Sequence, residues 1–113
     1  MAKAAPYARW VSLLAAMRKE ASDAEFEGCE EVLAFIAVKE SAAEPVRITD
    51  VVQSLMFGTG PTVHRKVSLL AERGLLDVAA SKDDARAKRL TLTKAGATLL
   101  NERSKQMAET LKA

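Results

Sequence analysis

The sequence predicts a mainly α, α+β fold of about five helices with a two- to three-stranded antiparallel sheet. Apolar residues recur at three- and four-residue spacing through most of the chain, which is typical of amphipathic helices. Helix-start residues precede several of these segments, and a glycine follows one of them. Apolar and polar residues alternate in Leu75–Ala80 and in Arg89–Thr93, as they do in strands, and a polar segment lies between the two. With 113 residues and 49% hydrophobic content, the chain fits one domain, residues 1–113.

Two helices are expected before the first strand. Pro6 suits the first turn of a helix that extends to about Ala21. Ser22 and Glu25 match a capping box, so a second helix is predicted from Ser22 to about Lys39. The acidic face of the second helix, Glu27, Glu30 and Glu31, should point away from the core. Each helix has an apolar stripe on its other side. The stripe of the first helix is Tyr7, Trp10, Val11, Leu14, Met17 and Ala21, and that of the second is Phe26, Cys29, Val32, Leu33, Ile36 and Ala37.

A short polar connector, Ser41–Pro45, separates these helices from the middle of the chain. Val46–Ile48 can form a brief extended segment. Thr49 or Asp50 is then expected to cap a short helix that ends at Met56. The apolar positions of that short helix are Val51, Val52, Leu55 and Met56.

A basic helix is predicted directly after the turn Phe57–Gly60. Thr59 should cap it, and Pro61 occupies the first turn, where a missing N–H costs nothing. Arg73 and Gly74 form a typical helix end. The inward-facing residues are Val63, Val67 and Leu70.

The last predicted helix follows the two strands. Thr93 should cap it, and it extends to about Lys112. Gly96 is expected to be a weak point because glycine disfavours helix interiors. The helix has a thin apolar stripe of Leu99, Leu100, Met107 and Leu111. The complete order of elements is that of a winged helix-turn-helix.

Charge is segregated along the chain. Met1–Glu44 contains five basic and eight acidic residues, whereas Thr59–Lys94 contains eight basic and four acidic residues. Such a distribution gives one part of the molecule a positive field that attracts a polyanion. A basic helix beside a basic hairpin suits duplex DNA, since a helix fits the major groove and a flanking hairpin can reach the minor groove.

Two segments resemble the MarR family of bacterial transcription regulators. Thr62–Leu76 is similar to the recognition helix of that family and its Gly-Leu exit. The wing pattern of the family is matched by Asp84-Ala85-Arg86 followed by Leu90, Leu92, Thr93 and Gly96. The resemblance implies a homodimeric, sequence-specific regulator of double-stranded DNA, most often a repressor. Together with surplus apolar surface, it implies that 1–21 and 94–113 are dimerisation helices. It leaves open whether a small-molecule effector binds.

The candidate DNA contacts lie on the basic helix and the hairpin. Hydroxyls and free N–H groups at a helix start can hold a phosphate, although Thr59 also suits plain capping. Arg65 can read guanine bidentately, a contact worth about 1–3 kcal/mol of discrimination; a solvated charged face is the alternative. The candidates on this helix are Thr59, Thr62, His64, Arg65, Lys66 and Ser68.

In the hairpin, Arg86 is the leading candidate because a guanidinium at a hairpin tip can enter a narrow minor groove. Asp84 can orient it through a charge-assisted hydrogen bond. The alternative is an exposed ion pair worth about 0–1 kcal/mol. Three further cations, which can contact phosphates or remain solvated, are Lys82, Lys88 and Arg89.

Other residue types favour neither an enzyme nor a metal protein. Neither a nucleophile–base pair nor a phosphate-binding glycine loop is recognisable, and His64 has no partner histidine for zinc. Cys29 is expected to be a buried small hydrophobe rather than a redox sensor, and a single cysteine fits a reducing cytoplasm. Tyr7, Trp10 and Met17 fit a core or a dimer surface better than a ligand cage. No cofactor and no membrane contact are expected.

A second class of function stays open. A winged-helix module that binds proteins without reading DNA would keep the same scaffold, and the acidic first helices leave room for it. Retention on heparin or nonspecific DNA with a steep salt dependence distinguishes the two classes.

Overall fold

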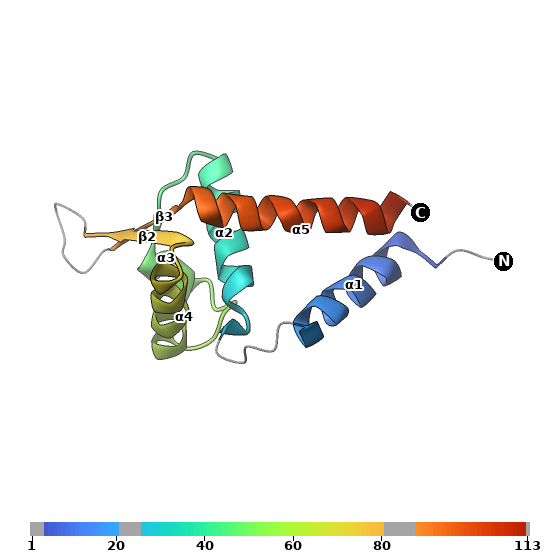
Figure 1. Ribbon diagram of the computed structural model, residues 1–113. Helices are drawn as coiled ribbons and strands as arrows, with labels where there is room; N and C mark the ends of the chain where they lie inside the picture. Colours follow the sequence, from blue (N-terminus) through green and yellow to red (C-terminus); the bar gives the residue numbers. More distant parts are fainter. Residues whose placement is uncertain (1–3, 21–25, 81–87, 113) are drawn as a thin grey trace.

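The computed structural model describes residues 4–20, 26–80 and 88–112. Within these ranges the chain forms an α+β fold of winged-helix type, with five α-helices and one three-stranded sheet. The elements are α1 (Pro6–Glu20), α2 (Cys29–Ser41), β1 (Val46–Arg47), α3 (Ile48–Gln53), α4 (Gly60–Glu72), β2 (Leu76–Ala79), β3 (Arg89–Leu92) and α5 (Lys94–Lys112) (Figure 1).

The sheet has the order β1-β3-β2, and both pairings are antiparallel. Its inner face contributes Val46, Leu76 and Leu90 to the core. The core continues through the inward faces of α2, α3 and α4, so these elements form one compact unit. Its buried helical residues are Cys29, Val32, Leu33, Ile36, Ile48, Val51, Val63, Val67 and Leu70.

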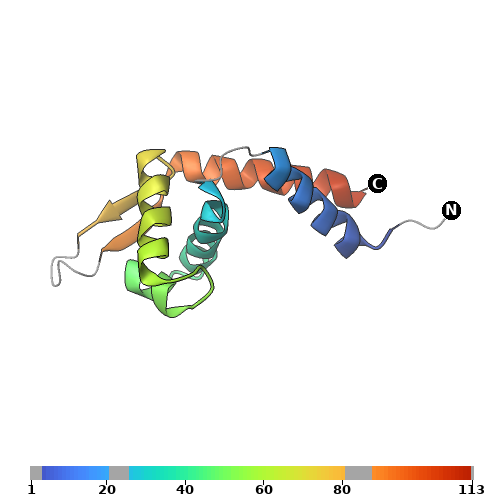
Figure 2. The same cartoon turned by 90° about the horizontal axis from the view of Figure 1, so that it is seen from below.

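Helices α1 and α5 extend away from this unit as an arm (Figures 1 and 2). The radius of gyration is 15.7 Å, whereas a compact chain of this length has about 13 Å. None of the described α1 side chains is buried, and Gly96 is the buried residue of α5. Tyr7 is 72% exposed and Trp10 38% exposed. Much of the predicted apolar stripe of the first helix therefore faces solvent in the single chain.

The start of α2 corrects the sequence prediction. The helix begins at Cys29 rather than at Ser22, and Phe26–Gly28 precede it without α-helical structure. Gly28 has φ 81°, a left-handed conformation that interrupts the helix on its N-terminal side. Ser22 and Glu25, the predicted capping box, lie outside the described residues.

The prediction for α3 was wrong at both ends. The helix begins one residue before Thr49, because the Asp50 carboxylate accepts a hydrogen bond from the backbone N–H of Arg47 at 2.8 Å. It ends at Gln53, and Leu55 follows with φ 60°. Leu55 and Met56, predicted as apolar positions of the helix, are 84% and 68% exposed.

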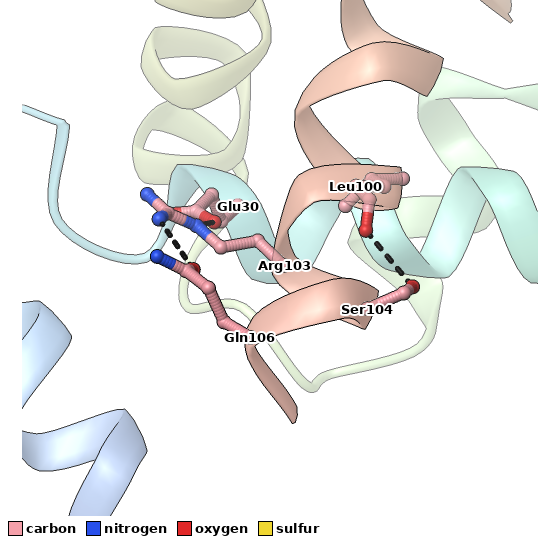
Figure 3. Close-up of polar contacts among 5 residues, drawn as sticks. All are labelled: Glu30, Leu100, Arg103, Ser104 and Gln106. Atoms are coloured by element: carbon pink, nitrogen blue, oxygen red, sulfur yellow. Dashed lines mark hydrogen bonds and ion pairs between the residues drawn. The ribbon is translucent and has the colours of Figure 1, made fainter. Parts of the chain in front are cut away.

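One residue of the predicted acidic face, Glu30 of α2, contacts α5 and does not point freely to solvent. Arg103 of α5 donates to the Glu30 carboxylate through its Nε at 2.8 Å and through a second nitrogen at 3.4 Å, and it also contacts Gln106 (Figure 3). The hydrogen bond to Glu30 raises the pKa of the Arg103 guanidinium. This pair joins the arm to the core unit, whereas Glu27 and Glu31 are exposed.

The predicted bounds of α4, of the two hairpin strands and of α5 are confirmed to within about a residue. Helix α4 ends at Glu72, with Arg73 as its C-cap and Gly74 at φ 73°. The Thr93 hydroxyl accepts a hydrogen bond from the Gly96 N–H at 3.0 Å and so caps α5. Gly96 has a role beyond its low helix propensity: a Cβ placed there would lie 2.3 Å from the Leu75 carbonyl oxygen.

Candidate nucleic-acid interface

Helix α4 and the β2–β3 hairpin lie at the end of the molecule opposite the free end of α5 (Figure 1). The chain passes from α4 through Gly74 and Leu75 directly into β2. Backbone contacts fix this junction, because the Leu75 N–H donates to the Leu70 carbonyl at 3.0 Å and the Thr93 N–H donates to the Leu75 carbonyl at 3.3 Å. The predicted recognition helix and the base of the predicted wing are therefore held together by a short, rigid connection.

Helix α4 is amphipathic as predicted. Val63, Val67 and Leu70 are buried on its inner face. His64, Arg65 and Ser68 are exposed on the outer face. Because residues at positions i and i+4 lie on the same side of a helix, His64 and Ser68 are neighbours, with Arg65 beside them. This outer face carries hydrogen-bond donors and a positive charge.

The turn before α4 places the two threonines together. Thr59 occupies the N-cap position, as predicted, but its side chain makes no capping hydrogen bond. Its hydroxyl instead lies 3.1 Å from the hydroxyl of Thr62. Phe57 anchors the turn in the core, where its ring contacts Phe35 edge-on at 5.5 Å between centroids. The hydroxyl pair thus lies at the start of the helix on a fixed turn.

Lys66 differs from the other candidates on α4. Its ammonium donates to the Phe57 carbonyl at 3.0 Å, so it bridges the helix and the turn that precedes it. The side chain also passes close to Gly28, where an added Cβ would lie 2.8 Å from Nζ. Lys66 is half-buried, and its charge already satisfies a backbone oxygen. Its geometry indicates a structural role, because it connects α4 to the turn that precedes the helix.

The hairpin is described only at its base. Lys88 and Arg89 are both exposed. Three other predicted contacts, Lys82, Asp84 and Arg86, lie outside the described residues, so the predicted Asp84–Arg86 pair stays a prediction. Of the eleven predicted site residues, the structure thus describes eight: six at the start of α4 and along it, and the two cations at the base of the hairpin.

Arg47 is a cation of this region that the sequence analysis did not select. It is exposed, and the β1–β3 register places it opposite Arg89. The two residues are far apart in the chain, and local patterns do not reveal the pairing. The alternation in Val46-Arg47, buried then exposed, is too short to have predicted the register.

Within residues 4–20, 26–80 and 88–112, three cations of this end, Arg65, Lys88 and Arg89, have no carboxylate partner. The described cations elsewhere are mixed: Lys39 pairs with Glu44 at 3.2 Å and Arg103 pairs with Glu30, whereas Lys94, Lys105 and Lys112 of α5 also have no carboxylate partner in these ranges. Unpaired cations contribute to a local positive potential.

In the part of the chain that the structure describes, no three His, Cys, Asp or Glu residues are grouped so that they could hold a metal ion. Cys29 is fully buried, as predicted. None of the described helices is both long and apolar enough to cross a membrane. In comparisons with known proteins, no family model matches the sequence, and no curated protein is significantly similar to it.

Proposed function

We propose that this protein is a sequence-specific regulator of transcription that binds double-stranded DNA as a homodimer, in the manner of MarR-type repressors. The main support is the set of exposed, unpaired cations on α4 and at the base of the hairpin, next to a winged-helix core. A polyanion would neutralise these charges and release counterions, which is the usual source of affinity for DNA. Such a regulator occludes a promoter, and we place it in the cytoplasm.

In this proposal α4 enters the major groove. Its outer face offers Arg65 for guanine, with His64 and Ser68 as neighbouring donors. Thr59 and Thr62 lie at the helix start, where hydroxyls suit a phosphate oxygen. Lys66 holds the turn against α4 through Phe57 and does not need to contact DNA. The predicted wing residues, Lys82, Asp84 and Arg86, would extend the contact into the adjacent minor groove.

The exposed apolar surface of the arm, α1 and α5, supports a homodimer. A hydrophobic surface on α1 and α5 remains open to solvent in the single chain, which costs free energy that a second copy would recover. The exposed apolar residues of this arm are Tyr7, Trp10, Val11, Met107 and Leu111. Two related α4 helices would then meet successive major grooves.

Selection of binding sites from random-sequence duplexes tests the proposal. We expect enrichment of a near-palindromic site whose half-sites are centred about 10 base pairs apart, because two-fold symmetric readers face successive turns of the duplex. The same preparation should sediment as a dimer at micromolar concentration. A pool that stays random after selection contradicts sequence-specific binding, and sedimentation as a monomer contradicts the homodimer.

One observation favours a second candidate, a protein-interaction module. Leu55 combines an exposed apolar side chain with φ 60°, a conformation that costs a leucine about 1–3 kcal/mol. Exposed Met56 lies next to it, and neither residue contributes to the core. A protein partner would bury both side chains. Protein binding through this turn would persist at high salt, whereas DNA binding would weaken steeply.

A further inference from the structure

The outer face of the sheet carries two arginines side by side. Val46 pairs with Leu90 and both are buried, whereas Arg47 pairs with Arg89 and both are exposed. Because side chains alternate between the two faces of a strand, the two arginines share the face that points away from the core. Directly opposite residues of an antiparallel pair have Cβ atoms about 4.5–5.5 Å apart. The two arginines are thus cross-strand neighbours whose guanidinium groups can reach the same ligand.

This arrangement is unfavourable in the free protein, because like charges directly opposite each other on a sheet destabilise it. Within the described ranges, no ion pair joins either arginine to a carboxylate. Glu40 and Glu44 line a shallow hollow with Arg89, but Glu40 accepts a hydrogen bond from the Leu92 N–H at 2.8 Å, and Glu44 pairs with Lys39. Asp77 of β2 lies opposite Thr91 of β3. Among the residues that the structure describes, no ion pair joins Asp77 to either arginine.

Hydrogen bonds hold the backbone at Arg47 and beside Arg89 in a fixed relation. The Arg47 N–H is bound by Asp50, and the next N–H along the chain, that of Ile48, donates to the Lys88 carbonyl at 3.0 Å. The start of α3 is therefore attached to the residue that precedes Arg89. Guanidinium groups bind phosphate oxygens bidentately, so a preorganised pair suits one phosphate or two adjacent ones.

We propose that Arg47 and Arg89 form a phosphate-binding site on the outer face of the sheet, and that its occupant is the backbone of the duplex read by α4. This inference rests on the proposed function and adds Arg47, on the edge strand β1, to the residues that contact DNA. The site positions the protein along the backbone and carries no sequence information of its own.

The test compares Arg47→Gln and Arg89→Gln with Lys105→Gln, which removes the same charge from an exposed position on α5. Affinity for a duplex is measured by fluorescence anisotropy over a range of salt concentrations. We expect each sheet variant to reduce the slope of log K against log salt by about 1.8 in magnitude, because a homodimer loses one phosphate contact of about 0.9 from each of its two protomers. Arg47→Lys should restore most of the slope, and Lys105→Gln should leave it unchanged.

Thermal unfolding without DNA separates binding from a structural role. Arg47→Gln should keep or raise the midpoint, since it removes a repulsion. Replacing chloride with inorganic phosphate at equal ionic strength should not move the midpoint of the unaltered protein. A rise that Arg47→Gln abolishes would assign the site to free phosphate and overturn its assignment to the duplex.

Two further results separate this inference from the proposed function. If the unaltered protein binds DNA but Arg47→Gln behaves like Lys105→Gln, the inference fails and the proposed function stands. If the unaltered protein binds no DNA, both fail.

Discussion

Replacing Arg65 and Arg86 together by alanine should lower the affinity for a selected duplex about 100-fold or more at ~150 mM salt, since each arginine is expected to supply a groove contact worth about 1–3 kcal/mol. Arg65 is exposed on the outer face of α4. Arg86 comes from the wing pattern and lies outside the described residues. The measurement is anisotropy titration of a labelled duplex.

Lys105→Ala is the matched control, because it removes one exposed cation from the arm rather than from the interface. Its affinity should stay within about twofold of the unaltered protein, as expected for a charge more than a Debye length of about 8 Å from the DNA. Undiminished binding by the Arg65→Ala, Arg86→Ala protein would refute the interface. An equal loss with Lys105→Ala would indicate a nonspecific effect of net charge.

Gly96→Ala should destabilise the fold by about 1–3 kcal/mol, although alanine is the better helix former. Gly96 is buried, and an added Cβ would lie 2.3 Å from the Leu75 carbonyl oxygen and 3.1 Å from a Leu92 methyl group. The carbonyl belongs to the backbone that joins α4 to β2, so it cannot move aside like a flexible side chain. Urea unfolding followed by far-UV circular dichroism measures the change.

Gly60→Ala provides the comparison for this substitution. A Cβ at Gly60 meets no atom within 4 Å, and the residue also lies in a helix. We expect its free energy of unfolding to be unchanged or slightly raised, by at most about 1 kcal/mol. If both alanine variants unfold at the same urea concentration, the close contact between α5 and the α4–β2 junction does not constrain the fold.

The sequence predicted best those elements whose limits depend on local signals. Pro61 and Gly74 mark the two ends of α4, and the alternation in Arg89–Leu92 marks β3. These signals operate within a few residues, so they can be read without the fold. The class of fold followed from the order of such elements, and the structure has that order.

The failures have other causes: one is a competing local signal, and two depend on contacts between different segments of the chain. The start of α2 was misplaced because a capping-box pattern at Ser22 outweighed the left-handed Gly28, which also leaves room for Lys66. The sequence does not distinguish Lys66 from other cations on an exposed helix, because its hydrogen bond to the Phe57 carbonyl depends on the folded turn. Arg47 became a candidate only through its register with Arg89. Periodicity does not encode these pairings.

The salt dependence of duplex binding by the unaltered protein tests the central claim most directly. That claim is that α4 and the sheet present unpaired cations to one duplex. Four phosphate contacts per protomer, from residues such as Arg47, Lys82, Lys88 and Arg89, predict a slope of log K against log salt of about −7 for the homodimer. A slope near zero, or no binding even at low salt, would contradict the account.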